Sequence, residues 1–160
     1  MKDSHSRHFL HRIRVCLFSF VFTAQSDFCQ KWNGSFFEKA SLQEVGLRKQ
    51  LGHRTGERCL NPEPCRSNEF WIVDSFGMHN VTIDFCACGH GDQRHTVQLL
   101  RARLYPATVI DPQSAATFDA LKSFEMLSYE SKVSAFEFYH TQSRLTDNTG
   151  VNKPNVCATS

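Results

Sequence analysis

Two cysteines at the end of a strictly alternating segment constrain this chain most. In the run Val81–Cys88 (VTIDFCAC), apolar residues alternate with a second set that ends in Cys86 and Cys88. Successive side chains of a β-strand point to opposite faces, so both thiols lie on one face, and Val81, Ile83 and Phe85 on the other. This spacing suits two ligands of one metal ion better than two separate disulfides.

The surrounding pattern predicts a β-hairpin. A β-type run at Phe70–Asp74 (FWIVD) is followed by a turn at Ser75–Met78 and then by the alternating segment. Apolar spacing predicts amphipathic helices at Thr96–Arg103, Ala115–Leu127 and Ser131–Leu145. A capping pattern with Ser41 and Glu44 predicts a further short helix over Ser41–Gln50. The predicted fold class is α+β: a small zinc-stabilised β-hairpin or sheet followed by two or three amphipathic helices.

The cysteine count bears on the redox state. The chain has 7 Cys and 8 His in 160 residues, and an odd number of cysteines leaves one thiol over in a full disulfide framework. Zinc in a reducing compartment is therefore favoured over disulfides. The net charge of +2 does not by itself indicate a nucleic-acid partner.

Four residues form the predicted zinc site: Cys59, His79, Cys86 and Cys88. His79 has the opposite parity to Cys86, so as a ligand it must lie in the turn or at a bulge. Cys65 is the obvious substitute, and His53 lies at the edge of the same region. Near the N-terminus, His8 and His11 form an HxxH pair, which alone is a weak signal.

The N-terminus permits a secretory interpretation. A basic segment, Met1–Arg14, precedes the apolar run Val15–Ala24, as in a signal peptide. That run is too short to span a bilayer as a helix. A secreted, disulfide-bonded Cys-rich protein, cleaved near Ala24, is thus an alternative to an intracellular zinc protein.

Known catalytic motifs are missing from the sequence. It contains no GxSxG, no phosphate-binding Gly loop and no HExxH, and its carboxylates form no pair of recognisable spacing. We therefore expect a non-catalytic protein with no small-molecule substrate.

Several segments resemble the CxC-type cysteine-cluster domain associated with Kyakuja-Dileera-Zisupton (KDZ) transposases, which is abundant in fungi. They are HRI (His11–Ile13), KWNGSFF (Lys31–Phe37), LGHRTGERCLNP (Leu51–Pro62), WIVDSFGMHNVTIDFCAC (Trp71–Cys88), QLLRARLYPAT (Gln98–Thr108), AATF (Ala115–Phe118) and SKVSAFEFYHTQSRLTDNTG (Ser131–Gly150). The resemblance implies zinc binding through Cys59, His79, Cys86 and Cys88. It also implies an upstream zinc module, whose closing histidines match His8 and His11, and a following transposase region.

The resemblance divides the chain into four parts. Residues 1–14 are interpreted as the remnant of an upstream zinc module, 31–146 as the cysteine-cluster domain and 147–160 as a frayed tail. Relatives pass almost directly from HRI to the Trp-Asn-Gly turn, whereas residues 15–30 intervene here. We interpret this insertion as a retained intron, because its coding length is that of a small fungal intron. RNA sequencing with uniform coverage and no spliced reads there would contradict this.

The implied role is that of an accessory domain, in a fragment of a transposase gene, that binds DNA or the transposase protein. Arg94, Arg101 and Arg103 are candidates for phosphate contacts, and a solvated face is the alternative. A degenerate protein-interaction module without nucleic-acid affinity is the rival function. The expected location is nuclear or cytoplasmic, with no membrane association.

Overall fold

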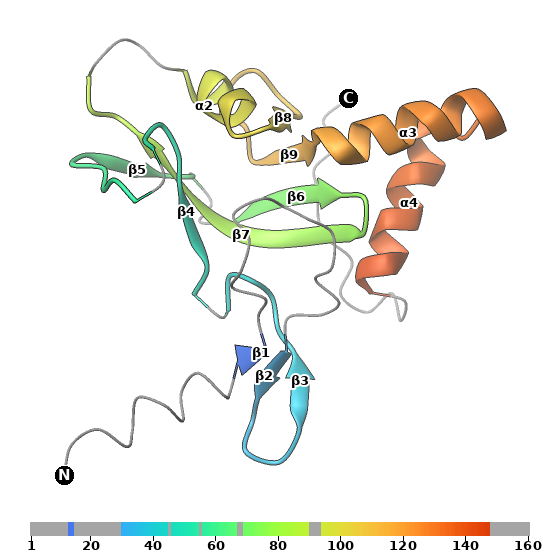
Figure 1. Ribbon diagram of the computed structural model, residues 1–160, viewed down its shortest axis with the longest axis horizontal. Coiled ribbons are helices and arrows are strands. Elements are labelled where there is room, and N and C mark those ends of the chain that lie inside the picture. The colour runs from blue at the N-terminus through green and yellow to red at the C-terminus, as the bar shows by residue number, and fades with distance from the viewer. Residues whose placement is uncertain are drawn as a thin grey trace.

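The computed structural model describes residues 13–14, 30–44, 46–54, 56–66, 69–89 and 94–147. A six-stranded mixed sheet has the order β4-β7-β6-β9-β8, with β5 also paired to β7 (Figure 1). Its strands are β4 (Arg48–Gln50), β5 (Pro62–Pro64), β6 (Phe70–Asp74), β7 (Gly77–Cys86), β8 (Leu104–Pro106) and β9 (Ser114–Thr117). The described helices are α2 (His95–Arg101), α3 (Phe118–Ser131) and α4 (Ala135–Thr146). The predicted α+β class, a hairpin and sheet followed by helices, is confirmed.

A second, three-stranded antiparallel sheet lies apart from the main one (Figure 1). It consists of β1 (Ile13–Arg14), β2 (Gln30–Trp32) and β3 (Phe37–Lys39). The predictions for His8 and His11, for most of the 15–30 insertion and for a tail beyond residue 147 lie outside the described residues.

The β6–β7 hairpin is the centre of the fold. Its antiparallel register runs without interruption from Asp74↔Gly77 to Phe70↔Val81. Strand alternation puts one face of β7 into the core, where Val81, Ile83 and Phe85 are at most 1% exposed. The predicted hairpin and its alternation are confirmed, although β7 begins earlier than expected, at Gly77.

Two parallel pairings extend this hairpin into a sheet. On one side β4 pairs with Thr82–Asp84 of β7, and on the other β9 pairs with β6. The helix predicted over Ser41–Gln50 was wrong. The capping pair does form, because Ser41 Oγ accepts from Glu44 N at 3.1 Å and Glu44 Oε2 accepts from Ser41 N at 3.0 Å. The chain then turns at Gly46 (φ 83°) and becomes an edge strand, since pairing with β7 outweighs the local helix signal.

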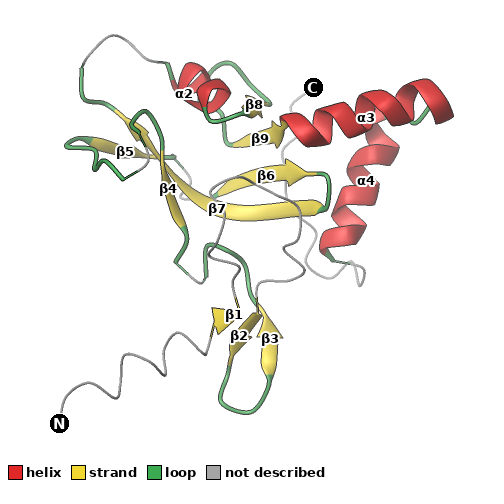
Figure 2. Ribbon diagram, viewed as in Figure 1, coloured by secondary structure: helices red, strands yellow, loops and turns green. Residues whose placement is uncertain are grey.

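The helices sit beside the sheet (Figure 2). α2 is held against β7 by His95, whose ring stacks on Phe85 with centroids 3.9 Å apart. α3 begins at Phe118, and the helix predicted from Ala115 was wrong for its first three residues because they form β9 between β6 and β8. Thr117 caps α3 by accepting from Ala120 N at 3.1 Å, and its hydroxyl donates to the buried Asp74 at 2.7 Å.

α4 returns from α3 to the far end of β7. The rings of Phe124 and Phe138 join the two helices at 5.3 Å. At the end of α4, Thr146 Oγ1 hydrogen-bonds both main-chain polar atoms of Met78. No helix among the described residues is long and apolar enough to span a membrane.

The start of α4 carries a complete capping box. Ser134 Oγ accepts from Glu137 N at 3.2 Å, and Glu137 Oε2 accepts from Ser134 N at 2.9 Å. We expect Ser134→Ala to lower the free energy of unfolding by about 1 kcal/mol, measured by urea denaturation. Those hydrogen bonds lower the pKa of Glu137. The contribution of the box to the stability of α4 is therefore present at neutral pH and is lost as pH falls through that lowered pKa. An equal cost of the substitution at neutral and strongly acid pH would contradict this assignment.

Candidate metal centre

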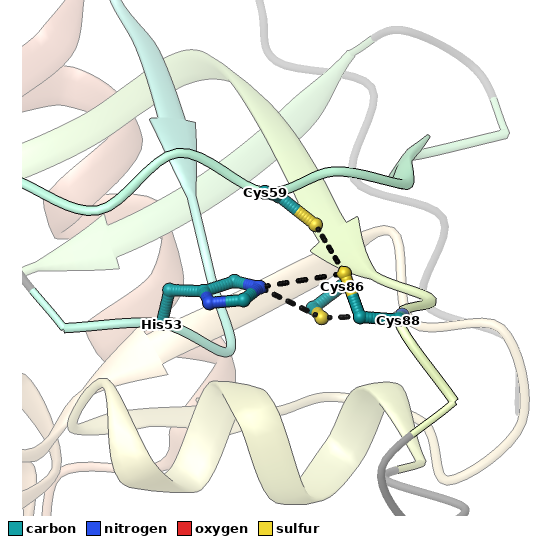
Figure 3. Close-up of side chains that lie close together, drawn as sticks. All are labelled: His53, Cys59, Cys86 and Cys88. Atoms are coloured by element: carbon teal, nitrogen blue, oxygen red, sulfur yellow. Dashed lines mark hydrogen bonds between the residues drawn. The ribbon is translucent and has the colours of Figure 1, made fainter.

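Four side chains converge where β7 ends: His53, Cys59, Cys86 and Cys88 (Figure 3). Their ligand atoms all lie within 4.8 Å of one another. His53 Nε2 is 3.1 Å from the sulfur of Cys86 and 3.7 Å from that of Cys88. The sulfurs of Cys59 and Cys88 are 3.3 Å apart.

Two segments supply these side chains in pairs. β7 ends at Cys86, and Cys88 follows in the turn that contains Gly89 (φ 74°). The other pair comes from the loop after β4. There Leu51 N still donates to Asp84 O at 2.8 Å, before Gly52 (φ 82°) turns the chain toward His53.

Gly52 lies at a close approach of the two segments. A Cβ at this position would lie 2.4 Å from Cys86 Cβ and 2.9 Å from Gln98 Oε1. Real Cβ atoms do not come this close to other atoms, and the left-handed φ independently favours glycine. The sequence therefore needs glycine here to bring the His53 loop against the end of β7.

The histidine presents one nitrogen to the thiols and the other to a carboxylate. With Nε2 facing the sulfurs, Nδ1 lies 3.9 Å from Glu57 Oε2. A metal-binding His commonly directs its second ring nitrogen to a carboxylate, which fixes the orientation of the ring. The His53 side chain is 23% exposed, so this face of the site is partly open to solvent.

Two of the thiols have strongly different proton affinities. The hydrogen bond from Cys59 lowers the pKa of the Cys88 thiol to about 6, with further help from His53 and the backbone at Asn61. Partial burial raises the pKa of the Cys59 thiol to about 11, and its hydrogen bond to Cys88 adds to the rise. At neutral pH Cys88 is thus largely thiolate, the form that binds metal, while Cys59 holds its proton.

The donor set and its spacing fit zinc. Bonds of about 2.3 Å to sulfur and 2.0–2.1 Å to nitrogen, arranged as a tetrahedron, place neighbouring ligand atoms about 3.5–3.8 Å apart. Three of the six pairs of ligand atoms are 3.1–3.7 Å apart, and all lie within 4.8 Å, so modest side-chain adjustments would match this geometry. Among the described residues Cys59, Cys65, Cys86 and Cys88 are free thiols.

The structure brings together three of the four ligands predicted from sequence, Cys59, Cys86 and Cys88, with His53, which was an alternate. His79 lies elsewhere, opposite Ile72 in the β6–β7 ladder. No bulge interrupts that ladder, so His79 keeps the opposite parity to Cys86.

Cys65, the other alternate, is 4% exposed and belongs to the hydrophobic core. Its sulfur lies 3.9 Å from the carbonyl oxygen of Pro112, which is a weak contact in the interior.

Two glutamines that sequence reasoning did not single out border the cluster. Gln50 accepts from Cys59 N at 2.8 Å, and the buried Gln98 accepts from Cys86 N at 2.8 Å. The only signal for Gln98 was a polar residue in an otherwise apolar stretch of a predicted helix.

Comparison with protein families matches residues 42–150, about two thirds of the chain, to the "CxC2 like cysteine cluster associated with KDZ transposases". This chain belongs to that family. The match on this KDZ-associated domain runs from the turn before β4 to beyond α4, and it includes all four residues of the cluster. Searches of curated proteins and of solved structures gave no match to it.

Proposed function

We propose that this KDZ-associated domain binds one zinc ion through His53, Cys59, Cys86 and Cys88. The observation that carries the proposal is the convergence of one imidazole nitrogen and three thiol sulfurs, from two distant segments, at ligand spacing. Zinc held by four protein ligands is a structural ion, because it has no open position for a substrate. We therefore propose a non-catalytic role in which the metal fastens the His53 loop to the end of β7.

The test is the metal content of the full chain, purified under reducing conditions. We expect about one zinc per chain, lost in Cys86→Ser and Cys88→Ser, because each removes a thiolate ligand. The two histidine hypotheses are separated by a matched pair of variants: His53→Ala should lose the metal and His79→Ala should keep it. Absence of metal from folded wild-type protein would refute the site.

Zinc affinity should rise with pH. Zinc must displace the proton of Cys59, whose pKa is about 11, throughout the neutral range. Below a pH of about 6 the proton of Cys88 must be displaced as well, so the fall in affinity should become steeper there. Titration against a competing chelator between about pH 5 and pH 8 measures this, and a slope that stays constant through pH 6 would contradict it.

We propose duplex DNA as the partner of this accessory domain, because its family is associated with transposases. Arg94 and Arg101 are exposed at the two ends of α2, whereas Arg103 lies over the ring of Phe118 at 5.8 Å. Fluorescence anisotropy with duplex DNA should show binding that weakens as salt rises. Binding to transposase protein, with no DNA binding at low salt, would favour the rival role of a protein-interaction module.

We propose a nuclear or cytoplasmic location, since thiolate ligands require reducing conditions. The four described cysteines are free thiols, in keeping with this proposal. The secreted alternative instead requires disulfides and cleavage near Ala24. Intact-mass measurement with and without reductant separates the two, because each disulfide reduced adds two hydrogen atoms to the mass.

A further inference from the structure

We infer that Gln98 and Gln50 are positioning residues of the metal centre, each fixing the backbone that carries a ligand. This inference rests on the proposed zinc binding and adds two residues to it. Both side-chain amides bind main-chain atoms of the ligand-bearing segments.

Gln98 acts on Cys86 as a short piece of strand would. β4 accompanies β7 only as far as Asp84, and Gly52 then turns the chain away. The N–H and C=O of Cys86 would thereby lose their partners on this edge of the sheet. Gln98 supplies both: its Oε1 accepts from Cys86 N at 2.8 Å, and its Nε2 donates to Cys86 O at 2.9 Å. With both main-chain groups bound, the direction of the Cys86 Cα–Cβ bond is fixed before metal arrives.

The position of Gln98 is itself well fixed. The residue is 1% exposed, and its neighbour Leu99 is fully buried in the core. The stacking of His95 on Phe85 holds the first turn of α2 over β7. Leaving the two polar atoms of Cys86 without partners in such a setting is unfavourable, so Gln98 has a specific chemical task that an apolar residue could not perform.

Gln50 performs the equivalent task on the opposite segment. Its Oε1 accepts from Cys59 N at 2.8 Å, and its Nε2 donates to Glu57 O at 3.1 Å. These two bonds close the loop that carries His53 and Cys59, and they hold the residue whose carboxylate faces His53. Both glutamines thus use one acceptor and one donor to fix the backbone of a segment that carries a ligand.

The experiment compares zinc and cobalt binding by the full wild-type chain, Gln98→Met and Gln50→Met. Methionine is similar in length to glutamine but lacks both amide hydrogen-bonding groups. We expect zinc affinity to fall about 10- to 100-fold in each variant, as is usual when an outer partner of a ligand is removed. The bound cobalt should also show a weaker thiolate-to-metal charge-transfer absorption, a signature that loss of general stability alone would not change.

Gln142→Met is the matched control. Gln142 is also a buried helical glutamine, at 4% exposure, but its Oε1 has no hydrogen-bond partner among the residues that the structure describes. It lies in α4, which binds the opposite end of β7 through Thr146 and Met78. We expect zinc affinity and the cobalt spectrum of this variant to match the wild type.

The outcomes are distinct. Wild-type affinity and a wild-type cobalt spectrum in both test variants would overturn the positioning role while leaving zinc binding intact. A wild-type chain that takes up no zinc would overturn the proposed function and this inference with it. If Gln98→Met does not fold, Gln50→Met decides the question, because Gln50 is only partly buried and lies in an edge strand.

Discussion

Removing the proposed zinc ion with a chelator should unfold the end of the sheet that carries the candidate metal centre. A ligand present at 100 times its Kd stabilises the folded state by about 2.7 kcal/mol. Structural zinc binds so tightly that its concentration exceeds its Kd by more than this factor. We therefore expect a drop of at least about 2.7 kcal/mol in the free energy of unfolding of the zinc-loaded protein. Urea denaturation with and without chelator measures it.

Hydrogen exchange should show where this loss occurs. Amides of the His53 loop and of the last residues of β7 should lose protection first, because the proposed zinc ion would join these two segments. Amides in α4 should be affected least, since α4 is anchored at Gly77 and Met78, at the other end of β7. Uniform loss of protection across the sheet and α4 would contradict a local role for the metal.

Gly52→Ala should have the second large effect, acting on both stability and metal binding. The left-handed backbone costs a non-glycine residue about 1–2 kcal/mol, and overpacking adds about 1–3 kcal/mol. The added Cβ must push against Cys86 Cβ and Gln98 Oε1, so the variant should also bind zinc more weakly. Thermal denaturation and a zinc titration measure the two effects.

Gly56→Ala in the same loop is the control for the backbone. Gly56 also has a left-handed φ, +94°, but a Cβ there meets no atom of the described residues within 4 Å. Gly56→Ala should therefore lower the free energy of unfolding only by the cost of the left-handed backbone, and it should leave zinc affinity unchanged. Equal zinc affinities in the two variants would show that the close approach at Gly52 does not matter for the site.

The hairpin and the spacing of Cys86 and Cys88 could be predicted because their signals are local. Alternation over Val81–Cys88 places Cys86 and the core residues on opposite faces whatever the rest of the chain does. The capping box of α4 is likewise encoded within four residues, by Ser134 and Glu137. Each of these features depends on short-range geometry alone.

The histidine of the cluster could not be chosen from local pattern. His53 reaches the thiols because β4 pairs in parallel with β7, so that the chain after Gly52 emerges beside Cys86. No local sequence pattern near Arg48–Gln50 predicts a strand. The capping pair at Ser41 and Glu44 instead favours a helix. His79 is nearer in sequence to the cysteine pair, but nearness along a regular strand does not bring it to their face.

The glutamines were missed for a related reason. Their role is to satisfy main-chain groups that become unpaired only where particular strands stop, and sequence does not show where β4 leaves β7. Gln98 binds the main chain of Cys86 just beyond Asp84, where the β4–β7 pairing ends. Gln50 binds the main chain of Cys59 at the end of the turn-rich loop. Which backbone donors and acceptors lack a main-chain partner depends on the strand pairing, which the sequence does not show.

The two parallel pairings also have a kinetic consequence. β4 meets β7 with Arg48 opposite Thr82, and β6 meets β9 with Trp71 opposite Ser114, so both contacts join parts of the chain far apart in sequence. Closing the long loops between such strands costs conformational entropy before the strand pairing stabilises the chain, and this makes folding slow. During that delay the cysteines are exposed and able to form non-native disulfides. Newly made chains should therefore reach the native state in higher yield when zinc and a reductant are present from the start.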